Sequence, residues 1–341
     1  MLKLSYVFRV LRGARFQKLS TVIDRVHTIT GKNKAAIFFD IVNCAFQYGA
    51  GYNDYNIFAF YDMNHAQRKT YVTRMKNKKI MSLFNDEDYA YIFDEKNAFD
   101  MRFRGFIRRD FLDLKSANLN DFEHFMLDKD VIFAKPYSAE SGKGIEKLKK
   151  SDFISLKEMF DYVTSPQKPF GLLEELIVQH EDMSRLYPLA VNSIRVGTVL
   201  DEKGVAHCAY ATCKMGNEGK FVDNMENSGL ACPIDQETGV ICGVAHTSKL
   251  VNYDTHPYTG VKLVGYKVPF AREAIELCKQ AALVVPQMRY VGWDVCIMPD
   301  GPAIIEGNNY PGYDFFQLPE HTPDKIGLYP FFQKMSGGKL K

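Results

Sequence analysis

The segment with the densest set of chemically active side chains runs from Val291 to Asp314 and reads VGWDVCIMPDGPAIIEGNNYPGYD. Its pattern predicts two strands joined at Pro299-Asp300-Gly301, a sequence that suits a three-residue loop ending in a left-handed glycine. The register of this loop predicts three facing pairs: Met298 with Pro302, Cys296 with Ile304, and Asp294 with Glu306. Asn308 follows on the same face, so one side of the hairpin gathers two carboxylates and an amide.

The opposite side of this hairpin is predicted to face a core, because it carries Trp293, Val295, Ile297, Ala303 and Ile305. Like charges directly opposite each other destabilise a sheet. A hard divalent cation reverses the sign of that interaction, and Mg²⁺ takes oxygen ligands of this kind. The alternative is a hairpin with two solvated acids, and a two-residue Asp-Gly loop would turn Asp294 to the apolar side.

A second candidate site surrounds Lys135, near the end of the predicted strand Val131–Pro136. Alternation places this lysine on the same face as two apolar residues, so we expect it to meet an anion. Gly142, Lys143 and Gly144 follow in a short loop whose backbone N–H groups can approach phosphate oxygens. The phosphate-loop pattern GxxxxGK[ST] is absent, and an ordinary surface turn is the alternative for this loop.

The elements that would position these residues alternate between helices and short strands from Phe93 onward, as in α/β or α+β domains. The predicted strand at 171–180 carries Glu174 and Glu175, whose burial is unfavourable unless each carboxylate has partners. A strand at 191–200 carries Arg195, and an amphipathic helix at 270–285 leads back to the hairpin. Residues 1–90 have a mixed and mostly helical pattern.

Composition is ordinary for a globular protein, since 46% of the 341 residues are hydrophobic and 25% are charged. The net charge of +2 excludes nothing by itself, and no segment reaches the roughly 18 apolar residues of a membrane span. Seven scattered cysteines without CxxC pairs favour reduced thiols in the cytoplasm. Residues 1–26 predict a basic amphipathic helix, which packs on its own domain or contacts a membrane surface or a partner.

Seven strings of this sequence resemble the ATP-grasp superfamily, and within it the sugar-transfer-associated ATP-grasp family. They occur in the family's order and spacing between Tyr89 and Gly312: FDEKNAF, FAKP with ESGKGI, LLEELIVQH, VNSIRVGT, VDN, GWDV and IIEGNN. The resemblance implies an α+β fold in which two lobes hold ATP between them, preceded by the mostly helical N-terminal region. The corresponding domains are residues 1–90, a first lobe at 91–182 and a second lobe at 183–335.

The resemblance also implies roles for individual residues. Lys96 and Lys135 correspond to the two phosphate-contacting lysines, and Gly142, Lys143 and Gly144 to the loop over the phosphates. Glu174 and Glu175 correspond to the hinge at the adenine edge, with the Ile177 backbone N–H as a partner for the ring and Glu181 as a ribose ligand. The Mg²⁺ ligands correspond to Asp294, Glu306 and Asn308, in agreement with the hairpin register. Arg195 would meet the γ-phosphate or an acyl phosphate.

The chemistry implied is ATP- and Mg²⁺-dependent joining of a carboxylate to an amine through an acyl phosphate, with release of ADP and phosphate. Such catalysis depends on positioning and on neutralising phosphate charge, so it needs no side-chain nucleophile. The family name suggests a small-molecule or glycan carboxylate in surface polysaccharide assembly. The alternatives are a phosphotransferase on the same fold and a non-catalytic nucleotide-binding partner of a glycosyltransferase. Nothing in the sequence indicates a nucleic-acid partner.

Overall fold

The computed structural model describes residues 16–137 and 144–341, which divide into two units. The first unit joins the N-terminal helices to residues 201–205 and to the C-terminal segment 310–341. The second unit comprises residues 86–200 and 206–309, and it contains both sheets. None of the described helices is both long and apolar enough to cross a membrane.

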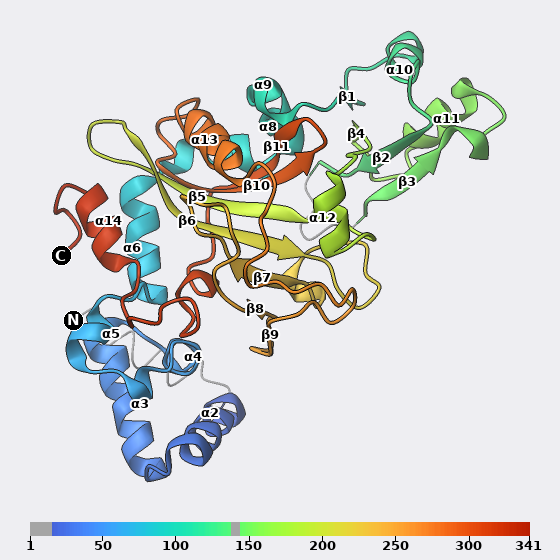
Figure 1. The fold of residues 1–341 in the computed structure, drawn as a ribbon. Helices are drawn as coiled ribbons and strands as arrows, with labels where there is room; N and C mark the ends of the chain where they lie inside the picture. The colour runs from blue at the N-terminus through green and yellow to red at the C-terminus, as the bar shows by residue number, and fades with distance from the viewer. Residues whose placement is uncertain (1–15, 138–143) are drawn as a thin grey trace. The chain divides into compact units, whose positions relative to one another are not determined.

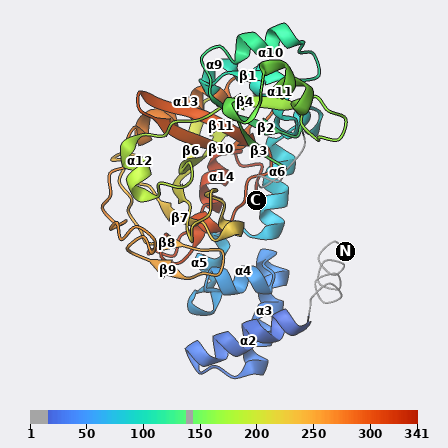
Figure 2. The same ribbon diagram turned by 90° about the vertical axis from the view of Figure 1, so that its right-hand side faces the viewer.

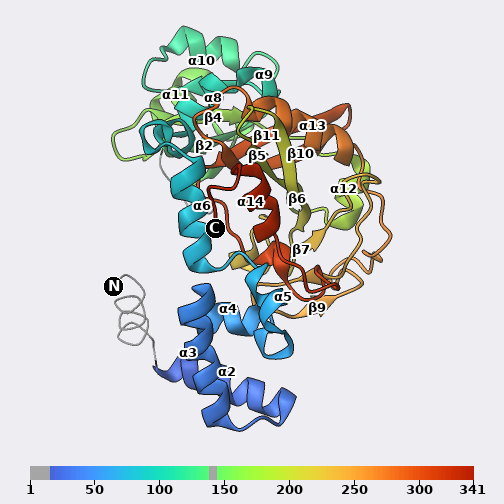
Figure 3. The same ribbon diagram turned by 90° about the vertical axis from the view of Figure 1, so that its left-hand side faces the viewer.

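The first unit is helical, as predicted for the N-terminal region (Figure 3). Its helices are α2 (Phe16–Thr30), α3 (Lys34–Tyr48), α4 (Tyr52–Ile57), α5 (His65–Lys69), α6 (Arg74–Phe84) and α14 (Tyr329–Met335). The helix α3 is capped at its N-terminus by Asn33, whose side chain accepts a hydrogen bond from the Ala35 N–H, and at its C-terminus by the left-handed Gly49. The first fifteen residues of the predicted basic helix lie outside the described chain, and its contact with a membrane or partner stays a prediction.

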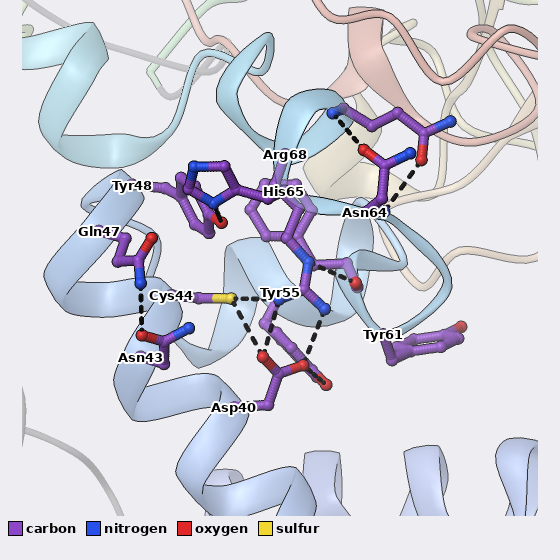
Figure 4. A network of polar contacts seen from close by, with 12 residues as sticks. Asp40, Asn43, Cys44, Gln47, Tyr48, Tyr55, Tyr61, Asn64, His65 and Arg68 are labelled. Atoms are coloured by element: carbon purple, nitrogen blue, oxygen red, sulfur yellow. Dashed lines mark hydrogen bonds and ion pairs between the residues drawn. The ribbon is translucent and has the colours of Figure 1, made fainter.

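A partly buried ion pair joins three helices of this unit (Figure 4). The guanidinium of Arg68 donates from Nη1 and Nη2 to the two carboxylate oxygens of Asp40, at 2.7 and 2.8 Å. The Tyr55 hydroxyl donates to the same carboxylate at 2.8 Å, and Arg68 Nε donates to the Phe60 carbonyl at 2.9 Å. Because α3, α4 and α5 each supply one of these side chains, the bidentate pair fixes their relative positions.

The second unit contains a four-stranded and a seven-stranded sheet (Figure 1). The smaller sheet has the order β1-β4-β2-β3, with β1 (Phe111–Asp113), β2 (Val131–Lys135), β3 (Glu146–Lys149) and β4 (Leu172–Glu175). Two helices, α10 (Leu119–Phe125) and α11 (Leu156–Val163), pack on one face of it (Figure 2). Ile132, Ala134 and Leu173 face those helices, so Lys135 and Glu174 lie on the other face.

The larger sheet has the order β11-β10-β5-β6-β7-β8-β9. Its strands are β5 (Ser193–Leu200), β6 (Ala206–Met215), β7 (Leu230–Pro233), β8 (Ala245–His246), β9 (Asn252–Tyr253), β10 (Tyr290–Met298) and β11 (Gly301–Asn308). The helix α13 (Ala271–Ala282) covers one face with a stripe of buried residues that includes Ala271, Ala274, Ile275 and Cys278. The opposite face carries the polar side chains of the strands.

Four further helices lie close to the sheets: α7 (Tyr91–Asp94), α8 (Lys96–Arg102), α9 (Arg104–Ile107) and α12 (Glu181–Leu186). Phe99 lies in α8 and Phe103 caps the C-terminal end of that helix. Both rings pack on Trp293, with ring centroids 6.4 and 5.3 Å from the indole. A Cβ on Gly307 would lie 2.9 Å from the Phe99 ring, so only glycine permits this close approach. This packing fixes α8, and with it Lys96, against β10 and β11.

The β10–β11 hairpin differs from its prediction in loop length and agrees with it at the polar pair. Met298 pairs with Gly301, so the loop has two residues, and the predicted pairs Met298–Pro302 and Cys296–Ile304 are wrong. A β-bulge then adds one residue to β11, and this restores the predicted pairing of Asp294 with Glu306. The same bulge makes Ile304, instead of the predicted Ile305, the member of the buried core beside Trp293.

We predict that Asp54 makes the stability of the first unit pH-dependent. The carboxylate is buried and accepts hydrogen bonds from the Tyr313 hydroxyl and from the N–H groups of Gly51 and Arg74. Burial raises the pKa of Asp54 to about 6, above the roughly 3.9 of an unfolded chain. Its stabilising effect is therefore complete below about pH 4 and is lost as the pH rises through about 6.

The variant Asp54→Asn keeps the shape and removes the charge, so its free energy of unfolding should change less between pH 4 and 7. The difference from wild type should be on the order of 2 kcal/mol. Urea unfolding at several pH values measures it, and Asp62→Asn, in an exposed ion pair with Lys325, is the control. Parallel pH profiles for wild type and Asp54→Asn would contradict the prediction.

Candidate active site

The polar face of the larger sheet carries one continuous row of paired residues. Thr212 of β6 pairs with Arg195 of β5, Arg195 pairs with Asp294 of β10, and Asp294 pairs with Glu306 of β11. Each of these residues alternates with core residues that face α13, so the strands must present them on the uncovered side. The row brings together three of the residues that the sequence predicted as functional.

Asp294 lies at the centre of this row and is almost fully buried. Arg195 donates to it from Nε at 2.5 Å and from Nη2 at 2.8 Å, and Lys214 Nζ donates at 3.2 Å. Burial alone would raise the pKa of Asp294, but the charges of Arg195 and Lys214 outweigh it and hold the pKa well below its usual range. The side-chain fork of Arg195, predicted to meet phosphate, therefore contacts Asp294.

Lys214 is a member of this site that the sequence did not reveal. It lies on β6 beside Ser193, and its Nζ is 3.7 Å from the carboxylate of Asp223 in addition to its contact with Asp294. Burial would lower the pKa of Lys214, but the carboxylates of Asp223 and Asp294 outweigh it and raise the pKa. The available signal was alternation in the strand at 206–215, which places Lys214 on the same face as Tyr210 and Thr212.

Glu306 differs from Asp294 in having no hydrogen bond or ion pair with the described part of the chain, although part of its surface reaches solvent. Its pKa is raised, first by partial removal of the carboxylate from water and then by the charge of Asp294. Asn308 lies on the same face, and its Nδ2 donates to the Gly292 carbonyl at 3.4 Å. The amide oxygen of Asn308 is not used in that bond.

These side chains fit a hard divalent cation. Glu306 offers two oxygens that accept no hydrogen bond from the described residues, and Asn308 offers an amide oxygen. Asp294 can share its oxygens because a carboxylate accepts about four bonds. Among residues 16–137 and 144–341 there is no group of three or more His, Cys, Asp or Glu side chains suited to a metal. An ion held here would therefore have two carboxylates and one amide as protein ligands, and this ligand set stays a prediction.

The uncovered face of the smaller sheet carries a second ion pair. Lys135 Nζ lies 2.6 Å from Glu174 Oε2, which confirms that this lysine meets an anion. Arg109 Nε approaches the same oxygen at 2.8 Å, and Glu174 is fully buried between the two cations. These contacts occupy the Glu174 carboxylate, and its predicted role at the adenine edge stays a prediction.

The two polar faces belong to one cluster of charges. The positive charge of Lys135 acts on the Glu306 carboxyl, and the charges of Glu306, Lys135 and Glu174 act on Lys96. Burial is the largest influence on Lys96 and lowers its pKa. The structure therefore brings Lys96, Lys135, Arg195, Asp294 and Glu306 together, although the sequence separates them by up to 210 positions.

The other predicted residues lie as follows. Gly142 and Lys143 fall outside the described residues, and Gly144, with φ of 74°, begins the described chain beyond them. Glu175 accepts a hydrogen bond from the Asp110 N–H, and Ile177 lies in the segment 176–180, which the His180 N–H anchors to the Ile297 carbonyl. Glu181 pairs with Arg185 at 2.6 Å on α12, and its described contacts do not reach the charge cluster.

Comparisons with known proteins assign this arrangement to a family. The profile of the sugar-transfer associated ATP-grasp family matches residues 75–323. No curated protein sequence matches the chain. Among solved structures, a D-alanine-D-alanine ligase from Coxiella burnetii is 11% identical over 73% of this chain and 55% of its own, with a TM-score of 0.38. D-alanyl-alanine synthetase A from Vibrio cholerae O1 biovar eltor is 12% identical over 71% and 63%, with a TM-score of 0.42.

A third structure, the ADP complex of N5-carboxyaminoimidazole ribonucleotide synthetase, is 9% identical over 69% of this chain and 52% of its own, with a TM-score of 0.41. Each of these alignments spans less than two thirds of the solved chain. The family profile spans well over half of the present chain. The protein has an α+β ATP-grasp fold with a helical N-terminal region, and it belongs to the sugar-transfer associated ATP-grasp family.

Proposed function

We propose that this protein is an ATP- and Mg²⁺-dependent carboxylate–amine ligase that forms an amide through an acyl phosphate in surface polysaccharide or glycoconjugate synthesis. ATP-grasp enzymes are typically ATP-dependent carboxylate–amine ligases, which supports this choice. The observation that carries it is the charge cluster in which Glu306 and Lys135 act on Lys96, and Lys135 acts on Glu306. Cations on both sheets and a carboxylate pair are what a bound triphosphate and its ion require.

The proposed reaction has two steps. A carboxylate oxygen of the substrate attacks the γ-phosphorus, so that an acyl phosphate forms and ADP leaves. An amine then attacks the carbonyl carbon, the carbon–oxygen bond to phosphate breaks, and the amine loses a proton as the amide forms. Both steps are limited by the negative charge of the phosphoryl group and by the alignment of the reactants.

The residues of the chain meet those two requirements. Lys135 would neutralise phosphate oxygens from the smaller sheet, and Lys96 would do so from the N-terminal end of α8. Arg195 and Lys214 hold Asp294 in a fixed orientation, so that no reorganisation of this carboxylate is needed during the reaction. A magnesium ion bound by Asp294, Glu306 and Asn308 would supply further neutralisation of the phosphates.

The first test of the proposal is nucleotide binding. Ligand at about 100 times its dissociation constant stabilises a fold by about 2.7 kcal/mol, so ATP or ADP with Mg²⁺ should raise the melting temperature by several degrees. A thermal-shift measurement with and without a chelator separates the contribution of the ion. If no nucleotide shifts the melting temperature of the folded protein, the proposed function is wrong.

The second test concerns the carboxylate pair. Glu306→Gln keeps the shape and removes one charge, so turnover should fall by about 10²-fold or more, the scale of losing one electrostatic partner. The raised pKa of Glu306 means that its ionised form is less stable in the fold than in the unfolded chain, and this penalty is present at neutral pH. Melting temperature without ligand should therefore hold or rise at pH 7.

The matched control for this variant is Glu273→Gln, on the exposed side of α13 and away from the polar face. It should leave both turnover and melting temperature unchanged. Near-normal turnover of Glu306→Gln, or failure of that variant to fold, would show that Glu306 serves the structure and not the reaction.

The third test separates a ligase from a phosphotransferase. Hydroxylamine should trap the acyl phosphate as a hydroxamate, and only when ATP, Mg²⁺ and the carboxylate are all present. A panel of hexuronic acids and amino acids supplies the carboxylates, and those labelled with ¹⁸O should transfer label to the released phosphate. A stable phosphorylated hydroxyl product without ¹⁸O in free phosphate would replace the ligase with a kinase.

A further inference from the structure

Arg109 is the most extensively bonded buried side chain near the charge cluster, and neither the sequence motifs nor the proposed reaction assigns it a role. Its side chain is almost fully buried. Besides Glu174, it contacts Asp100 Oδ1 from Nη2 at 3.2 Å. It also donates to the backbone of β11, from Nη1 to the Ile304 carbonyl at 2.9 Å and from Nη2 to the Ile305 carbonyl at 3.1 Å.

The two carbonyls that Arg109 binds are those of the β-bulge. Val295 pairs with Ile304 and the neighbouring Asp294 pairs with Glu306, so Ile305 is the extra residue of β11. A bulge interrupts the ladder, and buried carbonyl groups in the interruption need other donors. Arg109 supplies both donors from a single planar group.

The bulge matters because it corrects the register that the two-residue loop would otherwise impose. Continuing the ladder from Met298–Gly301 without an extra residue would place Ile305 opposite Asp294 and turn Glu306 toward the core. With the bulge, Ile304 stays in the core and Glu306 stays on the polar face beside Asp294. The position of one proposed ion ligand therefore depends on a local irregularity of the strand.

We propose that Arg109 is a positioning residue that holds the β11 bulge and thereby places Glu306 opposite Asp294, while its bond to Glu174 ties the same bulge to Lys135. One guanidinium thus links the polar faces of both sheets. The claim about strand geometry stands on the contacts alone, and the claim about ion binding rests on the proposed function.

The side-chain chemistry explains why arginine serves here. A guanidinium offers five N–H donors in a rigid plane. Arg109 uses them for four hydrogen bonds, to Glu174, to Asp100 and to the two bulge carbonyls. A lysine keeps the positive charge that Glu174 and Asp100 need, but a single ammonium cannot reach both bulge carbonyls as well. Arg109→Lys therefore separates the charge of the residue from its hold on the bulge.

The neighbouring Arg108 provides a matched control. It contacts the same hairpin, donating to the Pro302 carbonyl at 3.3 Å and pairing with Asp300, but it is much more exposed and does not touch the bulge. Arg108→Lys makes the same chemical change on the same hairpin. It should leave the readouts below at their wild-type values.

A second variant tests the route of the effect. Deletion of Ile305 removes the extra residue, so that Ile304 and the glutamate become consecutive and keep their facings without a bulge. If Arg109 acts through the bulge, combining this deletion with Arg109→Lys should restore what the lysine loses. If Arg109 acts only through Glu174 and Asp100, the deletion should restore nothing.

The first readout needs neither nucleotide nor metal. Hydrogen exchange of peptides covering residues 302–309 should be at least tenfold faster in Arg109→Lys than in wild type or Arg108→Lys, and slower again in the double variant. Fluorescence of Trp293, the chain's only tryptophan, reports whether the surrounding core is intact, because the indole lies one residue from Asp294. Wild-type exchange in Arg109→Lys would overturn the proposal.

The second readout is the Mg²⁺ concentration that half-saturates the thermal shift produced by ADP. It should rise at least tenfold in Arg109→Lys, while the shift by ADP in chelator stays unchanged. If Mg²⁺ has no effect in wild type, the proposed function is wrong. The hydrogen-exchange result alone then decides whether Arg109 holds the bulge. If Arg109→Lys does not fold and the Ile305 deletion fails to restore folding, the positioning role is wrong.

Discussion

The ion pair between Arg109 and Glu174 is the interaction on which the arrangement of the second unit depends. Both groups are buried, and removing two charges from water costs several kcal/mol per ion unless further hydrogen bonds compensate. Lys135 supplies a second cation to Glu174, and two backbone carbonyls and Asp100 complete the shell of Arg109. Burial alone would raise the pKa of Glu174, but the charges of Arg109 and Lys135 outweigh it and hold the pKa below its usual range. Loss of one partner would leave the others as uncompensated buried charges.

Both sheets use the same device to build a charged site. Successive residues of each strand point to opposite faces of the sheet. Because helices cover one face, the apolar residues point to that face and the polar residues between them point to the other. In the smaller sheet this brings Lys135 and Glu174 onto the same face, and in the larger sheet it aligns Arg195, Asp294 and Glu306. The covering helices α10, α11 and α13 therefore contribute to the site without supplying any residue that acts in it.

The sequence predicted the parts of this site that depend on residues close together in the chain, and it did not predict the parts that depend on distant segments. Alternation and a turn signal predicted correctly that Asp294, Glu306 and Asn308 share one face, but through a loop register that the structure does not have. The loop length was nevertheless wrong, and a bulge that no local pattern indicates compensated for it. Arg109, Lys214 and the return of residues 310–341 to the N-terminal helices were not predicted, since each depends on contacts between segments far apart in the chain.

The distribution of bonds over the two carboxylates bears on how an ion would be held. Asp294 already accepts three hydrogen bonds from Arg195 and Lys214, whereas Glu306 accepts none from the described residues. The positive charges of Arg195 and Lys214 beside Asp294 weaken the attraction of this carboxylate for a metal ion. Ion binding would therefore depend more on Glu306 than the Asp294–Glu306 pairing alone suggests. A nucleotide would add phosphate oxygens and shift that balance. An ion at the proposed site would therefore bind better together with the phosphates of a nucleotide than as a free ion, as Mg²⁺ does where it has few protein ligands.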